Sequence, residues 1–204
     1  MKKQRKNRTT KPDYTKLLIL LIPMILACSA FLPLAQAVVP APDGGYAGGN
    51  TAEGHAALFS LTSGEYNTAV GFLSLRSNTE GTLNTAIGAG TLLLNVGDPS
   101  VEKGIENTAT GAGALLSNTT GAFNSAHGAF ALFSNTEGAF NTANGESALL
   151  NNIGGNGNTA TGFRALYNNL TGADNTANGI LALYGNTTGD FNTAVGAKIG
   201  RAHV

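Results

Sequence analysis

The sequence contains no tryptophan and only one cysteine, Cys28, among its 204 residues. A lone thiol cannot form a disulfide within the chain, so packing and backbone hydrogen bonds must hold the fold together. Long apolar runs are also scarce, because the one clear run, residues 17–34, lies near the N-terminus. The rest of the chain must build its core from short, regularly spaced apolar residues.

Charge is scarce as well. Only 12% of the residues are Asp, Glu, Lys or Arg, about half the usual share. The body, residues 38–204, has five basic and eleven acidic residues, a net charge of −6, and its basic residues form no stripe. A mildly acidic surface repels phosphate backbones, so we expect no nucleic-acid partner.

The sequence has no recognisable catalytic or metal-binding pattern. His55, His127 and His203 stand in unrelated contexts without metal-ligand spacing. The acidic residues are scattered, and no phosphate-binding loop, nucleotide fingerprint or nucleophile elbow occurs. We therefore expect a protein that is not an enzyme, with no catalytic, cofactor-binding or metal-binding residues and no cofactor.

The sequence is dominated by a repeat. Copies begin at nine asparagines that are 17 residues apart, except for one gap of 23 residues between Asn84 and Asn107. These asparagines are Asn50, Asn67, Asn84, Asn107, Asn124, Asn141, Asn158, Asn175 and Asn192. A fixed period of this size indicates a stacked-repeat architecture.

Several positions hardly vary among the copies. The third residue is always Ala and the fifth always Gly, while the ninth is Leu, the twelfth Asn and the fifteenth Gly in most copies. Seventeen residues are too few for a helical hairpin, but they suffice for one coil of a β-solenoid. We expect an all-β, parallel β-solenoid (β-roll) of about nine coils over residues 50–198, about 40 Å long at the usual strand spacing.

Each position has an expected role in the coil. The Thr-Ala-x block is predicted to be a strand with Ala inward, and the Ala-Leu-x block a second strand or one helical turn with Leu inward. Asn and Gly, which tolerate positive φ, are expected in the turns. Equivalent asparagines one coil apart are expected to form hydrogen-bonded ladders.

The six extra residues of the third copy fall in the segment 96–103. Asp98-Pro99 favours a turn, so this insert is expected to bulge from one edge without disturbing the stack. It is either a recognition loop on a rigid scaffold or a tolerated insertion.

Large apolar residues recur at two further positions. The tenth position has Phe59, Leu93, Leu116, Phe133, Leu150, Tyr167 and Tyr184, and the seventeenth has Tyr66, Leu83, Phe123, Phe140 and Phe191. Because strand neighbours point to opposite faces, a ninth residue inside the coil predicts an outward apolar stripe at the tenth. Such a stripe indicates a homo-oligomer; the alternative is a bend that places both residues inside.

The ends of the chain carry separate signals. Residues 1–37 combine a basic start, an apolar run and Ala35-Gln36-Ala37, which is typical of a secretory signal peptide. A lipoprotein signal with Cys28 as the lipidated residue, and an uncleaved membrane anchor, are the alternatives. Residues 38–49 are expected to be a Pro/Gly-rich linker, and residues 199–204 (IGRAHV) a foreign tail, so that any anchor would lie outside this sequence.

The blocks Asn84–Ala89 and Asn192–Ala197, Asn-Thr-Ala-(Ile/Val)-Gly-Ala, resemble the head repeats of trimeric autotransporter adhesins, the YadA-like heads. The wider array is similar to repeats in secreted and tail-fibre-like bacterial proteins. This resemblance implies a left-handed parallel β-roll, a trimer, a place at the bacterial outer membrane or outside the cell, and binding to host matrix or glycan surfaces.

The function expected from the sequence is therefore that of a secreted or cell-surface structural or adhesive protein. One alternative is a self-associating extracellular sheath or matrix component without a specific receptor. Another is a carbohydrate-active β-solenoid enzyme, which would need carboxylates gathered in one groove.

Overall fold

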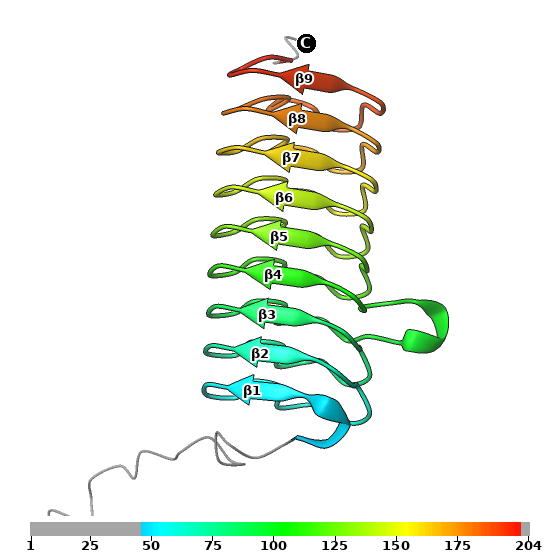
Figure 1. Ribbon diagram of the computed structural model, residues 1–204. Coiled ribbons are helices and arrows are strands. Elements are labelled where there is room, and N and C mark those ends of the chain that lie inside the picture. The colour runs from blue at the N-terminus through cyan, green and yellow to red at the C-terminus, as the bar shows by residue number, and fades with distance from the viewer. Residues whose placement is uncertain (1–45, 201–204) are drawn as a thin grey trace, which may run out of the picture. The chain divides into compact units, whose positions relative to one another are not determined.

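The computed structural model describes residues 46–200 and shows one short strand in each of nine coils (Figure 1). The predicted signal peptide, residues 1–37, lies outside the described residues, as do most of the predicted linker and residues 201–204. The strands are β1 (Thr51–Glu53), β2 (Thr68–Val70), β3 (Thr85–Ile87), β4 (Thr108–Thr110), β5 (Ser125–His127), β6 (Thr142–Asn144), β7 (Thr159–Thr161), β8 (Thr176–Asn178) and β9 (Thr193–Val195).

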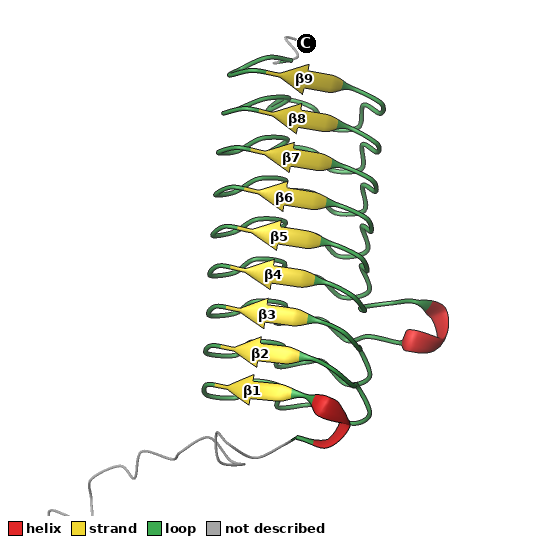
Figure 2. Cartoon of the chain, viewed as in Figure 1, coloured by secondary structure: helices red, strands yellow, loops and turns green. Residues whose placement is uncertain are grey.

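The strands form a single parallel sheet in chain order, β1 to β9. Each strand pairs with the next in register, so that Ala109 of β4 lies beside Ala126 of β5. The register continues across the 23-residue gap, where Ala86 pairs with Ala109. The predicted parallel β-solenoid is therefore confirmed, and the loops that close the coils make up the rest of the stack (Figure 2).

The core contains two main rows of apolar side chains. The third-position alanines are at most 3% exposed, and the ninth-position leucines at most 6%. The eighth position adds a row of small residues, such as Ala114, Ala131 and Ala148, which are fully buried. Both inward assignments made from the sequence are confirmed, and Leu is the largest apolar side chain that the interior holds.

Two rows of asparagines also run through the interior. In the first-position ladder, the backbone N–H and Nδ2 of Asn124 both donate to Oδ1 of Asn107 at 3.1 Å. In the twelfth-position ladder, Nδ2 of Asn135 donates to Oδ1 of Asn118 at 2.8 Å. The carbonyl of Gly138 accepts from Asn124 and Asn135, at 2.8 and 2.9 Å, and so ties the two ladders together. The predicted asparagine ladders are confirmed, and they satisfy polar groups that burial would otherwise penalise.

The second strand or helical turn expected at the Ala-Leu block is wrong, because the structure has a turn there. The ninth leucines adopt φ between 48° and 51°, and non-glycine residues at the seventh and seventeenth positions are also left-handed. This conformation interrupts an extended strand and bends the chain around the narrow core.

The turn residues were only partly predicted. The fifth-position glycines have positive φ, for example 131° at Gly128, as expected. None of the described asparagines has positive φ, contrary to expectation. Those at the first and twelfth positions instead have their side chains in the interior ladders. Apart from Gly104, which has φ 60°, the fifteenth-position glycines serve close approach instead: a Cβ on Gly138 would lie 2.6 Å from the carbonyl oxygen of Gly155 in the next coil.

The insert projects from one edge between β3 and β4 and leaves the stack intact, as predicted (Figure 1). It contains η2 (Pro99–Val101). At its base Val96 and Gly104 keep their backbone hydrogen bonds to the next coil, and Nδ2 of Asn118 reaches Oδ1 of Asn95 across the insertion at 2.8 Å.

Residues at both described ends of the stack continue the solenoid. Tyr46 and η1 (Ala47–Gly49), assigned to the linker, lie on the first coil, where Tyr46 packs against the core. Ile199 and Gly200 continue the ninth coil, and the carbonyl of Ile199 accepts from the N–H of Leu183 at 2.8 Å. Within residues 46–200, no helix is long and apolar enough to cross a membrane.

Candidate functional site

Potential metal ligands do not cluster on the described part of the solenoid. Residues 46–200 contain no group of three or more His, Cys, Asp or Glu side chains that could hold a metal ion. His55 stacks on Phe72 with ring centroids 5.6 Å apart, and Nδ1 of His127 lies 2.8 Å from the hydroxyl of Thr110. His203 lies outside the described residues. The candidate functional features are therefore the outer surfaces of the coils.

The strand face is the first of these surfaces. The second and fourth residues of each repeat point outward, while the alanine between them is buried. The second position is threonine in eight coils and Ser125 in the other, and register aligns these hydroxyls in one row along the sheet. The residue type at the fourth position differs among coils, from the charged Glu53 to the apolar Val195. This face therefore has one regular row beside one irregular row.

The tenth-position column is the second surface. Its apolar members lie outside the coil, Phe59 being 72% exposed and the others half-buried. Arg76 takes this position in the second coil. Tyr167 and Tyr184 stack with centroids 5.2 Å apart. This placement agrees with an outward stripe and not with a bend that puts both the ninth and tenth residues inside.

Residues of the sixth and seventh positions extend this column. Phe130 meets Phe133 edge-on at 5.7 Å, and the Arg164 guanidinium lies 4.8 Å from the ring centre of Phe163 and 5.4 Å from that of Tyr167. Nε of Arg164 is the one buried side-chain nitrogen or oxygen among the described residues that has no hydrogen-bond partner. The sequence analysis missed these neighbours, because in-and-out alternation does not place the sixth, seventh and tenth positions at one edge, whereas the chain turns at the left-handed seventh and ninth residues.

The seventeenth-position residues form a separate, interrupted column. Tyr66, Leu83, Phe140 and Phe191 are between 51% and 79% exposed. Phe123 and Phe140 stack with centroids 4.9 Å apart and planes 4° from parallel. Glu106, Gly157 and Asp174 take this position in other coils, so the apolar column is broken.

The insert makes a groove beside the Phe123–Phe140 stack. This insert groove has a volume of about 440 Å³. It is lined by Val101, Glu102, Lys103, Thr120, Ala122, Phe123, Glu137, Ala139 and Phe140. The groove thus combines three residues of the insert with the fourteenth, sixteenth and seventeenth positions of two successive coils.

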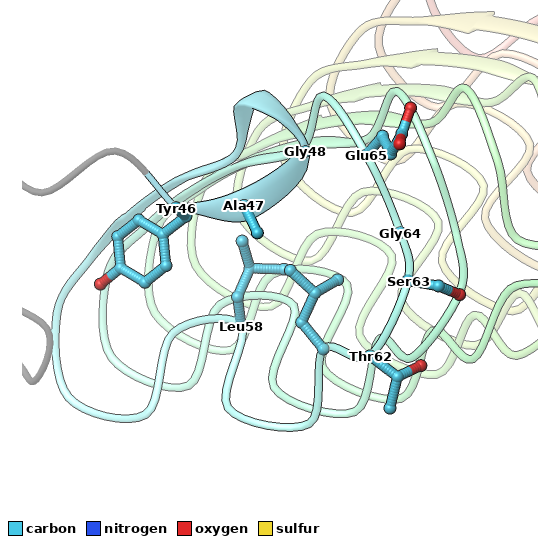
Figure 3. Close-up of a pocket in the computed structure, with 9 residues that line it drawn as sticks. Tyr46, Ala47, Gly48, Leu58, Thr62, Ser63, Gly64 and Glu65 are labelled. Carbon is cyan, nitrogen blue, oxygen red and sulfur yellow. The ribbon is translucent and has the colours of Figure 1, made fainter.

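A second pocket of about 440 Å³ lies at the start of the first coil (Figure 3). Tyr46 and Leu58 lie on one side of the view, and Ser63 and Glu65 on the other. Leu61 also lines it and takes the twelfth position, where later coils have the ladder asparagine. The pocket is the end of the apolar core, and Glu65 is the one carboxylate in its lining.

Comparison with known proteins finds no family model, no curated protein and no solved structure that matches the chain.

Proposed function

We propose that this protein is a non-catalytic, secreted or cell-surface rod of the adhesin-head kind, which acts by self-association and by contact with host matrix or glycan surfaces. The observation that carries the proposal is the tenth-position column, which places large apolar side chains outside a regular solenoid. The resemblance of Asn84–Ala89 to YadA-like head repeats supports the same role. The basic and apolar segment 1–37 supports export.

The column supports a homo-oligomer for a physical reason. The column leaves part of a row of large apolar side chains in contact with water, since Phe59 is exposed and the other apolar members are half-buried. Apolar surface gathered in this way marks interfaces. Leu93, Leu116 and Leu150 have no polar atoms in their side chains to offset their contact with water. Burying them against a second copy removes apolar surface from water, which contributes about 25 cal/mol for each Å². The resemblance favours a trimer.

Sedimentation equilibrium of residues 38–198 at micromolar concentration tests this proposal. We expect a trimer mass for the parent and a monomer mass for Phe133→Glu, which puts a charge into the column. Phe140→Glu is the matched control, because it makes the same change in the seventeenth-position column and should leave the trimer intact. A parent that sediments as a monomer contradicts the self-association.

Retention of the protein on coated surfaces distinguishes an adhesin from a sheath or matrix component. An adhesin should remain on surfaces coated with collagen, fibronectin or glycans after washing. A rod that forms trimers but is retained on none of these surfaces would instead be a sheath or matrix component. Hydrolysis of an offered polysaccharide would favour the carbohydrate-active enzyme.

A further inference from the structure

The insert groove is held in shape by hydrogen bonds of its own. Backbone groups of Asp98 and Lys103 pair in both directions, at 2.7 and 3.0 Å, and close the base of the insert. The Asp98 carboxylate accepts from the backbone N–H of Ser100 at 3.0 Å and from its hydroxyl at 2.6 Å. The insert therefore presents Val101, Glu102 and Lys103 in one arrangement, so little order has to be gained when a ligand binds.

The walls of the groove differ in polarity. Phe123 and Phe140 with Ala122 and Ala139 form an apolar side that follows two coils. The polar residues Thr120 and Glu137 of the same coils also line the groove. A ligand that fits these walls needs an apolar face and several hydroxyl groups around it. A hexopyranose ring has this form, since its axial C–H bonds make an apolar face and its hydroxyls project from the rim.

The charges of the groove select among sugars. Glu102 and Glu137 contribute two carboxylates and Lys103 one ammonium group, a net charge of −1. Carboxylates accept hydrogen bonds from sugar hydroxyls but repel a sugar carboxylate or sulfate, and the ammonium group donates to hydroxyl oxygens. The volume of about 440 Å³ falls within the usual range of small-ligand pockets, roughly 300–1,000 Å³. The groove thus favours a neutral sugar over an acidic one.

We propose that the insert groove binds the terminal neutral hexopyranose of a glycan, with the apolar face of the sugar against the Phe123–Phe140 side. Glu102, Glu137, Thr120 and Lys103 exchange hydrogen bonds with its hydroxyls. This inference rests on the proposed surface role and names the class of ligand. Glu102 and Glu137 are both exposed, and we assign them to hydrogen bonding with the sugar and not to its cleavage.

The repeats supply matched variants for a test. In one variant, residues 96–103 are replaced by Thr-Glu, which stands at the equivalent positions 136–137 of the fifth coil. The asparagine ladders already run past the insert, so the stack should fold without it. A second variant, Phe140→Ala, removes one ring from the groove. Its control, Phe191→Ala, removes a ring from the same position of the eighth coil, away from the insert.

The measurement is binding of residues 38–198 to a glycan array whose neutral members end in glucose, galactose or N-acetylglucosamine and whose acidic members are sialylated or sulfated. We expect retention on neutral members. Phe140→Ala and the insert replacement should each weaken binding about tenfold or more, equivalent to about 1.4 kcal/mol, while Phe191→Ala stays within about twofold of the parent.

Several results would overturn the sugar site. These are retention on no member, retention on acidic members alone, equal binding by the insert replacement, and cleavage of the bound glycan. If the protein is a trimer that binds no glycan, the sugar-site proposal fails and the self-association proposal stands. If it is a monomer whose glycan binding depends on the insert, the sugar site stands and self-association fails. The two proposals can therefore fail separately.

Discussion

Each coil of this solenoid places residues other than glycine in the left-handed region. Leu132 at the ninth position has φ 51°, Phe130 at the seventh 58° and Phe140 at the seventeenth 58°. An L-residue in this region carries strain of about 1–3 kcal/mol. The strain is tolerated because Leu132 is fully buried and the backbone of each coil is hydrogen-bonded to its neighbours.

The seventh position offers a test of this strain. Ser147 there has φ 57°, whereas Gly90 and Gly113 take the same position in two other coils. Ser147→Gly should therefore raise the free energy of unfolding by up to about 1 kcal/mol, since glycine adopts this region without steric cost. Thermal unfolding followed by circular dichroism measures the change.

The adjacent substitution Ala148→Gly is the control. Ala148 is fully buried at the eighth position and has no positive φ. This change should lower the free energy of unfolding by about 0.5–1 kcal/mol through lost backbone entropy, and by more through lost packing. If Ser147→Gly destabilises as much as Ala148→Gly, left-handed strain is not a property of the seventh position.

The asparagine ladders are the elements that combine polarity with burial. Every interior rung has its oxygen and nitrogen engaged; Oδ1 of Asn135, for example, accepts from Nδ2 of Asn152 at 2.8 Å. Leucine at the same position would bury more apolar surface but would leave carbonyls such as that of Gly138 with fewer donors. The ladders also favour a single register, because a slipped coil would leave buried amides without partners.

Asn135→Asp tests the ladder. The new carboxylate would face Oδ1 of Asn118 and the carbonyl of Gly138, to both of which Asn135 now donates. Burial of an unpaired charge among acceptors should lower the free energy of unfolding by several kcal/mol. The midpoint of denaturant unfolding at neutral pH records the loss.

Asn156→Asp is the matched control on the outside of the coil. Oδ1 of Asn156 accepts from the N–H of Ala139 at 2.7 Å, and Oδ1 of Asp190 accepts from that of Ala173 at the same distance, two coils later. The aspartate therefore already has a place in this structure, and the control should stay within about 0.5 kcal/mol of the parent. Equal effects of the two substitutions would contradict a structural role for the ladder.

At the scale of the whole solenoid, stability is shared between neighbouring coils. The contacts of each strand with other strands are with those immediately before and after it. The stability of such an array is approximately the sum of the intrinsic stabilities of its repeats and of the interfaces between neighbouring repeats. Their length can therefore change without a change in fold, provided that whole coils are added or removed.

Deletion of residues 124–140, one complete coil, tests this sharing. Asn141 would then follow Phe123 and meet Asn107 with the geometry that Asn124 now has. We expect a cooperatively unfolding β-protein that is less stable than the parent, as seen by far-UV circular dichroism and thermal melting. Deletion of residues 124–137, which removes 14 residues, should break the register and abolish cooperative unfolding. A folded 14-residue deletion would show that the register is not specified by the coil.

The sequence alone determined the repeating part of the structure. Seventeen-residue spacing, with Ala126, Leu132 and Asn135 at constant positions, was enough to predict the parallel sheet, the inward rows and the ladders. The reason is that a stacked coil places equivalent residues directly over one another, so the pattern read in one copy can be checked against the other copies. The insert could be placed on an edge because Asn107 resumes the same pattern after it.

The tertiary structure decided which outward residues meet. In-and-out alternation puts Phe123, Phe140 and Phe133 outside but does not say which of them share an edge. That depends on turn angles at residues such as Leu132, whose left-handed φ follows from packing and not from any preference of leucine. The path of the insert was likewise undetermined, and only its hydrogen bonds place Lys103 beside Phe123 to form the groove.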